Sequence, residues 1–432
     1  MFIEEVISRI WQPVTNRYKE CYDEAVRCNP EELYNNIVSD MNKKNNTTDK
    51  WINITILETS GCPHCNRNGI FLGCSFCDYF SRNIAGYAKM AALNKIDSNL
   101  YAKAVRRKFE QQRGVLVDPG VSELISGHDC LNPEELTDEA FDEMFNQGNL
   151  FNRKAMFFYL ETRASSINEK KLAKLKGKIG RKVVIEFGAE VANEWIRNHW
   201  LNKGITDENI YSAIENIRRI GFFSNANILI GIPGMNGRQS LELFKDTFDI
   251  LDTAGADYIL CSPLIRQGYT MQNYLFQEFR DNPTLIETGV TRGNSTGLPE
   301  IFTVFDAIFW VISERSESLK KLILGPVFFP PYLNFIQNLY KGDPNEIIVN
   351  KVLLAIEKFN EQRDYSELIK IRKEVLDSSY YNEYKRRMEN LQGKEGIQET
   401  FSTVAEEISK KMWPEQWRTK FEIFKSELLE YK

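Results

Sequence analysis

Four of the eight cysteines in this 432-residue chain lie within the segment 61–79, in two pairs of the form Cys-x2-Cys. The pairs are Cys62 with Cys65 and Cys74 with Cys77. Closely spaced thiols of this kind are typical of a metal site. The first pair follows the apolar run at residues 54–57, so we expect it to leave the carboxyl end of a β-strand, where α/β sheets place their ligands.

The spacing alone leaves two metal centres open. Two such pairs can wrap one zinc ion tetrahedrally, and a zinc-stabilised binding protein without catalytic activity is one alternative. Against zinc, the loop between the pairs has only eight residues and interrupts an enzyme-sized α/β chain. The other centre is an iron–sulfur cluster held by three thiolates, which leaves one iron free to bind a cofactor or substrate. We favour the cluster, with Cys62, Cys74 and Cys77 as its ligands.

The segments Thr59-Ser-Gly-Cys62 and Gly73-Cys-Ser-Phe-Cys77-Asp-Tyr79 resemble the cluster loop of radical S-adenosylmethionine (SAM) enzymes. The usual pattern of that superfamily is Cys-x3-Cys-x2-Cys, whereas this chain reads Cys-x11-Cys-x2-Cys. The wider loop is similar to that of one branch, the radical SAM subunit of archaeosine synthase and its uncharacterised relatives. Cys65 is left over in this loop, and Cys62 is favoured over it as a ligand because Cys62 follows the strand end.

Later segments resemble the same branch in the same order, so that the resemblance covers about residues 52–312. The segments are Ser126-Gly-His128 followed by residues 132–136, Leu160-Glu-Thr-Arg163, Glu186-Phe-Gly-Ala-Glu190 followed by residues 202–204, and Ile228-Leu-Ile-Gly-Ile-Pro-Gly234. The resemblance implies one [4Fe–4S] cluster and SAM as cofactors. It also implies reductive cleavage of SAM to a 5′-deoxyadenosyl radical, which abstracts hydrogen from an organic substrate.

The resemblance implies SAM contacts at the ends of several strands. Ser126 and Gly127 would lie near the methionine amine, and Glu186 or Glu190 would accept hydrogen bonds from the ribose. If one of these two carboxylates is structural, Arg163 is its expected ion-pair partner. The full set of expected cofactor-binding residues is Ser126, Gly127, Glu161, Glu186, Glu190, Ile230, Gly231 and Pro233. No catalytic residue is assigned, although His128, Cys130 and His199 are single candidates for proton or hydrogen transfer.

Alternating strand and helix patterns predict an α/β fold, a partial (βα)6 barrel similar to a TIM barrel. Because the connections require parallel strands, all carboxyl ends meet at one mouth. We expect an N-terminal helical segment at residues 1–50, the barrel at 51–312 and a mainly helical region at 313–432. Strands are predicted at residues 54–57, 115–117, 155–160, 183–187, 226–232 and 256–261, with further strand before Ser126. Helices are predicted over residues 2–38, 84–112, 205–220 and 238–254.

Composition limits the partners. The net charge of −5 gives no overall basic footprint, so tRNA, the substrate expected for a lyase like the archaeosine subunit, is considered and not favoured. Local basic stretches occur at residues 170–182 and at Lys385-Arg-Arg387. We expect instead a small metabolite or biosynthetic intermediate, whose bonds are cleaved or rearranged. An external one-electron reductant of the flavodoxin or ferredoxin type would supply electrons, and a partner protein is worth testing.

The chain shows neither a long apolar run nor a basic, secretory start. We therefore expect a soluble, cytoplasmic and oxygen-sensitive protein without membrane contact. After Cys261 no cysteine follows, which argues against further clusters in the C-terminal region.

Overall fold

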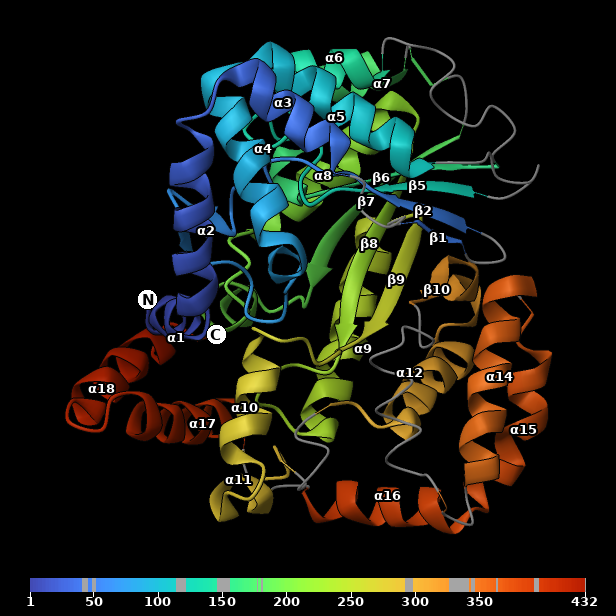
Figure 1. Ribbon diagram of the computed structural model, residues 1–432. Coiled ribbons are helices and arrows are strands. Elements are labelled where there is room, and N and C mark those ends of the chain that lie inside the picture. The colour runs from blue at the N-terminus through green and yellow to red at the C-terminus, as the bar shows by residue number, and fades with distance from the viewer. Residues whose placement is uncertain are drawn as a thin grey trace.

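The computed structural model describes most of the chain (Figure 1). The described residues are 1–40, 46–48, 52–113, 122–145, 156–176, 178–179, 182–291, 298–325, 342, 346–362, 364–391 and 396–431. The expected strand at residues 115–117 lies outside them. No helix among these residues is long and apolar enough to cross a membrane.

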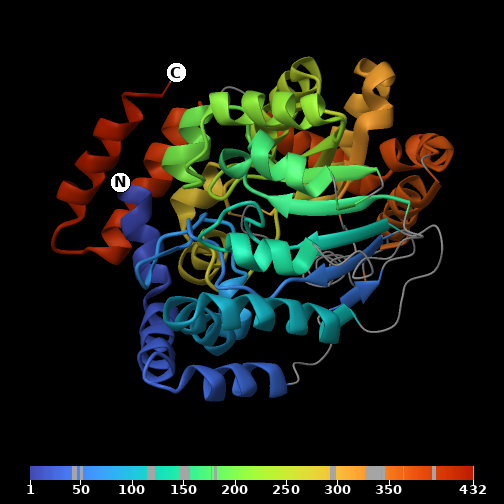
Figure 2. The same cartoon turned by 90° about the horizontal axis from the view of Figure 1, so that it is seen from above.

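One curled sheet runs through the middle of the molecule (Figures 1 and 2). Its order within the described residues is β1-β2-β5-β6-β7-β8-β9-β10, and all neighbours pair in parallel except β1 with β2. The strands are β1 (Asn46–Thr48), β2 (Ile52–Ile56), β5 (Ser122–Ser126), β6 (Phe158–Thr162), β7 (Val183–Glu190), β8 (Phe223–Ile230), β9 (Tyr258–Pro263) and β10 (Leu322–Leu324). The predicted partial barrel is confirmed.

Two strands of this sheet were not predicted from the sequence. The antiparallel edge strand β1 falls in the polar stretch at the end of the segment expected to be helical, and β10 has only three residues. Both are too short to show the alternation of polar and apolar residues on which such predictions depend. Parallel pairing with β9, rather than a pattern in its own sequence, makes β10 a strand and extends the sheet.

Helices cover one face of the sheet. The connecting helices are α4 (Ile84–Ile96), α5 (Ser98–Arg113), α6 (Asp138–Phe145), α7 (Glu169–Lys176), α8 (Asp207–Ile220), α9 (Gly237–Ala254) and α12 (Ile301–Glu314). Ile125, Leu160, Ile185 and Ala226 of the strands pack with these helices in one buried core. Since neighbouring residues of a strand face opposite sides, the residues between them point to the inner face, away from the helices.

The N-terminal segment folds as three helices rather than one. They are α1 (Phe2–Ile10), α2 (Gln12–Ala25) and α3 (Pro30–Ser39). Pro13 stands in the first turn of α2, where its missing N–H costs nothing, so it begins a helix instead of only interrupting one. Asn29 caps α3 through its side chain and Pro30 follows it, which separates α3 from α2.

The two ends of the chain lie side by side (Figures 1 and 2). The last helices are α17 (Ile397–Met412) and α18 (Trp417–Leu428). The Phe2 ring lies 5.1 Å from the Phe424 ring, and the Phe2 N–H donates to Glu427 at 2.9 Å. Phe424 is fully buried between Phe2 and the rings of Trp195 and Trp200. The aromatic stripe predicted for this tail therefore faces a core.

The remaining helices flank the sheet on the side of β9 and β10 or join the tail to it. They are α10 (Met271–Phe279), α11 (Pro283–Glu287), α14 (Glu346–Gln362), α15 (Ser366–Leu376) and α16 (Ser379–Asn390).

We expect Phe424→Ala to lower the free energy of unfolding by about 3 to 5 kcal/mol, because it removes a buried ring and leaves a cavity between the two ends of the chain. Urea unfolding followed by circular dichroism measures this loss. Lys425→Ala, at an exposed neighbouring position of α18, is the matched control and should stay within about 0.5 kcal/mol of the wild type. Equal stability of the two variants would show that the tail contributes little to the fold.

Candidate active site

The cysteine loop follows β2 at the carboxyl end of the parallel strands, as predicted. Gly61 precedes Cys62 with a φ of +87°, and a Cβ there would lie 2.2 Å from the Phe80 ring. Each cysteine pair forms a tight turn, in which Cys65 N–H donates to Cys62 O at 3.1 Å and Cys77 N–H donates to Cys74 O at 3.2 Å. Both turns bring the two thiols of a pair to the same end of the sheet.

Two other loops hold the cysteine loop in place. Asn202, after β7, donates its amide to the carbonyls of Leu72 and Gly73 at 2.7 and 3.0 Å. After β9, the Tyr269 N–H donates to the Asp78 carboxylate at 3.0 Å. Because these bonds reach both ends of the Cys74–Cys77 turn, the thiols are positioned by the barrel rather than by their own loop.

Cys65 differs from the other three cysteines. It is 8% exposed and packs in an apolar cluster, whereas Cys62, Cys74 and Cys77 are half-buried. A Cβ on Gly73 would lie only 2.6 Å from the Cys65 sulfur, so the loop is tightly closed over this thiol. The structure thus separates one buried thiol from three more accessible ones, which are the three favoured as cluster ligands.

Two buried cations, Arg163 and Lys203, face the thiols. Arg163 follows β6 and donates a hydrogen bond to Cys74, and it also donates to the backbone carbonyl of Lys203. Burial by itself would lower the pKa of Arg163, but the Cys62 and Cys74 sulfurs raise it above its usual value. Positive charge of this kind stabilises thiolates over thiols.

Burial dominates the ionisation of the thiols themselves. It raises the pKa of Cys62 to about 12, against the opposing effect of Arg163. The pKa of Cys77 is also raised, by burial first and by Cys74 second. These groups therefore need a bound cation to become thiolates, since the two protein cations alone do not offset burial.

Among the described residues, no three His, Cys, Asp or Glu side chains converge closely enough to ligate a single metal ion. All four thiols nevertheless interact electrostatically with one another. In an iron–sulfur cluster each cysteine binds a different iron atom, so its ligands are spaced more widely than those of one zinc ion. The donor set fits a cluster better than it fits a single ion.

Below the cysteines, one level of the sheet carries polar side chains on its inner face. We call Ser126, Glu161, Glu186, Asn225 and Asn227 the polar layer. Glu161 is in register with Glu186, and Glu186 with Asn225. The Ser126 hydroxyl donates to Glu161 at 2.5 Å. The layer therefore crosses four neighbouring strands, β5 to β8.

Glu186 is held by two amides of β8. Asn225 and Asn227 each donate their side-chain amide to one Glu186 oxygen, both at 2.9 Å. The amide oxygens of both asparagines are buried and accept no hydrogen bond from the described protein atoms. Because a buried acceptor without a partner is costly, these two oxygens are placed for something other than folding.

Glu161 and Glu186 form a close pair of carboxylates. Burial first and the neighbouring Glu186 second raise the pKa of Glu161 to about 7, while Ser126, His128 and Lys203 oppose the shift. The pKa of Glu186 is raised by burial and lowered in part by the two asparagines. No ion pair with Lys, Arg or His is found for either carboxylate in the described part of the chain.

The expected pairing of Arg163 with Glu186 or Glu190 is wrong. Lys203 takes that place, with its Nζ 2.6 Å from Glu190 Oε1. Gly188 makes room for this pair, since a Cβ there would lie 2.0 Å from the Glu190 carboxylate. Arg163 is unavailable because its guanidinium turns toward the cysteines and the Lys203 carbonyl.

The other residues expected to contact SAM are distributed differently. A Cβ on Gly127 would lie 2.3 Å from the Cys130 sulfur, so glycine is required for the turn after β5. Ile230 packs with its side chain in the core on the helix side, and Gly231 has a φ of +100° against Pro299 and Leu264. The Pro233 carbonyl accepts from the Trp200 indole at 2.6 Å. The structure thus groups Ser126, Glu161 and Glu186, with Glu190 above them, whereas the segment at residues 230–233 contacts mainly neighbouring apolar groups.

His128 lies in a buried polar and aromatic cluster. Its Nδ1 is 3.0 Å from Glu135, its Nε2 is 3.3 Å from the Tyr87 hydroxyl, and the Phe80 ring stacks on it at 5.6 Å. His199 stacks on Trp195 near Glu427, close to the tail and not with the polar layer. Cys130 is fully buried. Of these three candidates, His128 and Cys130 both interact electrostatically with the polar layer, through Glu161.

Sequence reasoning missed Lys203, Asn225 and Asn227. A signal for the last two was present, because β8 reads Phe-Ser-Asn-Ala-Asn-Ile-Leu-Ile, with two asparagines two residues apart in an otherwise apolar strand. Two polar residues at that spacing must share one face. Lys203 gave no such signal, since it lies in a loop.

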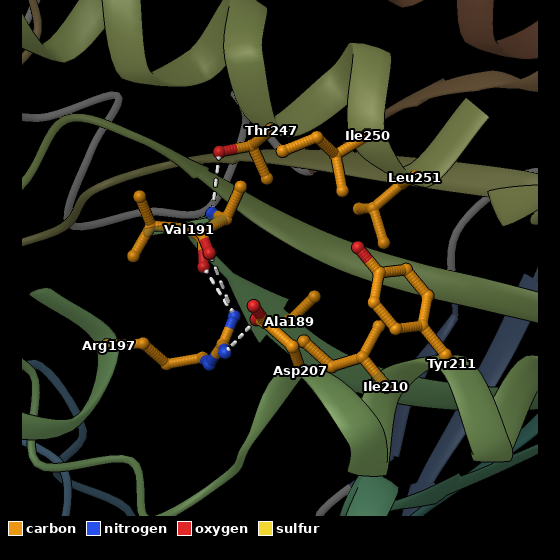
Figure 3. Close-up of a pocket in the computed structure, with 10 residues that line it drawn as sticks. Ala189, Val191, Arg197, Asp207, Ile210, Tyr211, Thr247, Ile250 and Leu251 are labelled. Atoms are coloured by element: carbon orange, nitrogen blue, oxygen red, sulfur yellow. Dashed lines mark hydrogen bonds and ion pairs between the residues drawn. The ribbon is translucent and has the colours of Figure 1, made fainter. Parts of the chain in front are cut away.

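A small cavity on the other side of the sheet is separate from this site (Figure 3). It measures about 30 Å³ and is lined by the end of β7 and by α8 and α9. Arg197 is fully buried beside it and donates to the Val191 carbonyl at 3.0 Å. Its volume suits a water molecule, so it is a packing defect rather than a substrate site.

Comparisons with known proteins give few relatives. No family model matches the chain. An uncharacterised protein of Methanocaldococcus jannaschii, MJ0550, is 32% identical over 176 residues, which are 40% of this chain and 45% of that protein. The chain thus spans less than half the length of this curated relative.

Several solved structures are similar in part. A queuine lyase from Clostridium spiroforme, bound to SAM and queuine, is 22% identical with a TM-score of 0.35, and covers 67% of this chain and 98% of its own. The radical SAM methyltransferase TsrM from Kitasatospora setae is 14% identical with a TM-score of 0.34, covering 54% and 40%. Neither is an archaeosine synthase. Because both TM-scores are low, the function proposed below rests on this chain's own residues.

We expect Glu161→Gln to remove a pH dependence of stability. The folded pKa of about 7 lies above the usual 4.5, so between these values the folded protein binds more protons than the unfolded chain. The unfolding free energy of the wild type therefore falls as pH rises from about 4.5 to 7, and this component is absent in the variant. Thermal unfolding over that pH range should show that the stability of the variant rises relative to the stability of the wild type as the pH increases.

Glu208→Gln, on the exposed side of α8, is the matched control and should follow the wild-type curve. Parallel curves for the wild type and Glu161→Gln would mean that Glu161 has the same pKa in the folded and the unfolded chain.

Proposed function

We propose that this protein is a radical SAM enzyme that binds one [4Fe–4S] cluster through Cys62, Cys74 and Cys77. The observation that carries the proposal is the placement of these three half-buried thiols, with Arg163 beside them, at the carboxyl end of a curled parallel sheet. Such an end is where barrel enzymes bind their ligands.

A bound cluster with SAM supplies a one-electron cleavage of the sulfonium and hence a 5′-deoxyadenosyl radical. The chain's own residues have other tasks. Arg163 offsets the negative charge of the thiolates, and the loops at Asn202 and Tyr269 fix the cysteine turns. The buried rings of Phe80 and Tyr87 pack on His128 and exclude water from that side. Each of these contributions is orientation or exclusion of solvent.

We assign SAM to the mouth above the polar layer. Ser126 and Gly127 end β5, Glu190 ends β7, and residues 230–233 follow β8, so that all are within reach of a ligand that spans the strand ends. In this assignment Glu190 is the ribose acceptor, and Lys203 pairs with it from the other side. Glu161 and Glu186 lie at the inner end of the same site.

The proposed substrate is a small organic metabolite, whose bonds are cleaved or rearranged after hydrogen abstraction, and the reductant is an external flavodoxin or ferredoxin in the cytoplasm. A tRNA substrate is less well supported, because three of the described lysines of the basic stretch are engaged. Lys171 lies over the Phe141 ring, Lys174 pairs with Asp142 at 3.4 Å, and Lys176 donates to the Ile220 carbonyl at 2.5 Å.

Anaerobic reconstitution with iron and sulfide tests the proposal. We expect about four irons per chain and formation of 5′-deoxyadenosine from SAM after reduction with dithionite. Cys62→Ala, Cys74→Ala and Cys77→Ala should each lose most of the iron and all detectable 5′-deoxyadenosine, because each removes a ligand.

Cys65→Ala is the matched control, since it removes a thiol of the same loop and should retain the iron. A colourless protein that holds one zinc ion and loses it in the Cys65 variant would overturn the proposal and leave a zinc-stabilised binding protein.

A further inference from the structure

The polar layer carries more negative charge than its surroundings offset. Glu161 and Glu186 are adjacent, and the nearest lysine, Lys203, is already paired with Glu190 at 2.6 Å. Two neighbouring carboxylates in a protein interior are stable only if they share a proton or bind a cation. Lys203 and His128 act on Glu161 only at a distance, and no Lys, Arg or His among the described residues pairs with either carboxylate, so the pair is left with a shared proton or a cationic ligand.

Unpartnered acceptors point to the same kind of ligand. Asn225 is 1% exposed, and its amide donates to Glu186 while its oxygen has no partner. Asn227 repeats this arrangement two residues further along β8. With one N–H of each amide committed to Glu186, the buried groups left without a partner in the layer are the two amide oxygens, which are acceptors. A ligand that fits must therefore bring several N–H or O–H donors.

An apolar level lies next to the polar layer on the same face. Two residues before Ser126, Glu161 and Glu186 in their strands stand Leu124, Tyr159 and Val184, which form a small cluster of their own with Phe157, Phe223 and Tyr258. Two residues of a strand span about 6.6 Å. A flat or partly apolar ligand can thus contact this level while its donors reach the carboxylates.

The layer also lies deeper than the proposed SAM contacts on two strands. Glu186 is four residues before Glu190, the end of β7, and Asn225 is five before Ile230, the end of β8. A bulge at Gly188 and Glu190 interrupts the even rise of β7, and Glu190 still acts electrostatically on Glu186. SAM at the strand ends and a second molecule between Glu161 and Glu186 are therefore neighbours, which meet at Ser126, a member of the layer and also a proposed SAM contact.

We propose that the polar layer binds the substrate through a cationic, N–H-rich group such as an amidinium, guanidinium or protonated amine, held between Glu161 and Glu186. The inference rests on the proposed function, for which it names the substrate class. Glu161 and Glu186 provide the charge, and Asn225 and Asn227 provide further acceptors. The apolar level contacts the rest of the substrate. The substrate carbon that loses hydrogen lies above the polar layer and faces the mouth of the barrel.

Benzamidine is a suitable probe, because it joins a flat apolar ring to an amidinium, and benzamide is its neutral counterpart of the same shape. Titrations of the reconstituted full-length protein, followed by saturation-transfer NMR under anaerobic conditions, should show benzamidine binding about tenfold more tightly than benzamide. Glu161→Gln and Glu186→Gln should each abolish that preference, whereas Glu208→Gln should keep it. Saturating SAM should leave benzamidine bound.

Three results would overturn the inference: equal binding of the two probes, a preference that survives both glutamine variants, or displacement of benzamidine by SAM. Glu161 is partly exposed, so its variant tests the layer even if the Glu186 variant fails to fold. Iron content is measured on the same samples. Iron-loaded protein without the preference refutes the inference alone, and iron-free protein with the preference refutes the radical function while the cation site stands.

Discussion

Parallel register is the constraint on which the rest of this structure depends. In β5 to β8, each strand places its residues level with those of its neighbour, so a side chain on the inner face of one strand meets its equivalent on the next. Register turns isolated polar residues of four strands into one layer, Ser126, Glu161, Glu186 and Asn225. It also brings every strand end to the side on which the cysteine loop lies. A slip of one residue in any of these strands would turn its polar residue into the helix-packed core.

Charge around the site is divided into two zones. Near the cysteines, Arg163 and Lys203 supply positive charge beside thiols whose pKa values are raised by burial. In the polar layer, carboxylates and amide oxygens supply negative charge and acceptors. Lys203 and Glu190 form an ion pair between the two zones, in which their opposite charges offset each other. An anionic metal cluster and a cationic substrate would each find the charge that complements it, on opposite sides of the place proposed for SAM.

Contacts far from the site support this arrangement. The tail helix α18 packs through Phe424 on Phe2 at one end of the chain and on Trp200 in the segment after β7. Two residues after Trp200, Asn202 binds the cysteine loop. The two chain ends therefore buttress the loop that positions Cys74, and a structural role for the tail follows without any ligand-binding group in it.

The sequence by itself determined the half-barrel, because alternating apolar strands and amphipathic helices allow few other folds, and the cysteine spacing predicted a metal site while leaving zinc and an iron–sulfur cluster both open. It also indicated which strand ends matter, including Ser126, Glu161 and Glu186. Only the tertiary structure decided the partners. Spacing along the chain cannot show that Lys203 rather than Arg163 neutralises Glu190, or that Asn225 and Asn227 turn their amides toward Glu186, since these pairs meet across loops and neighbouring strands. Local sequence fixes the period of a strand, whereas the partner of a buried charge is set by packing and by the cost of leaving that charge unpaired.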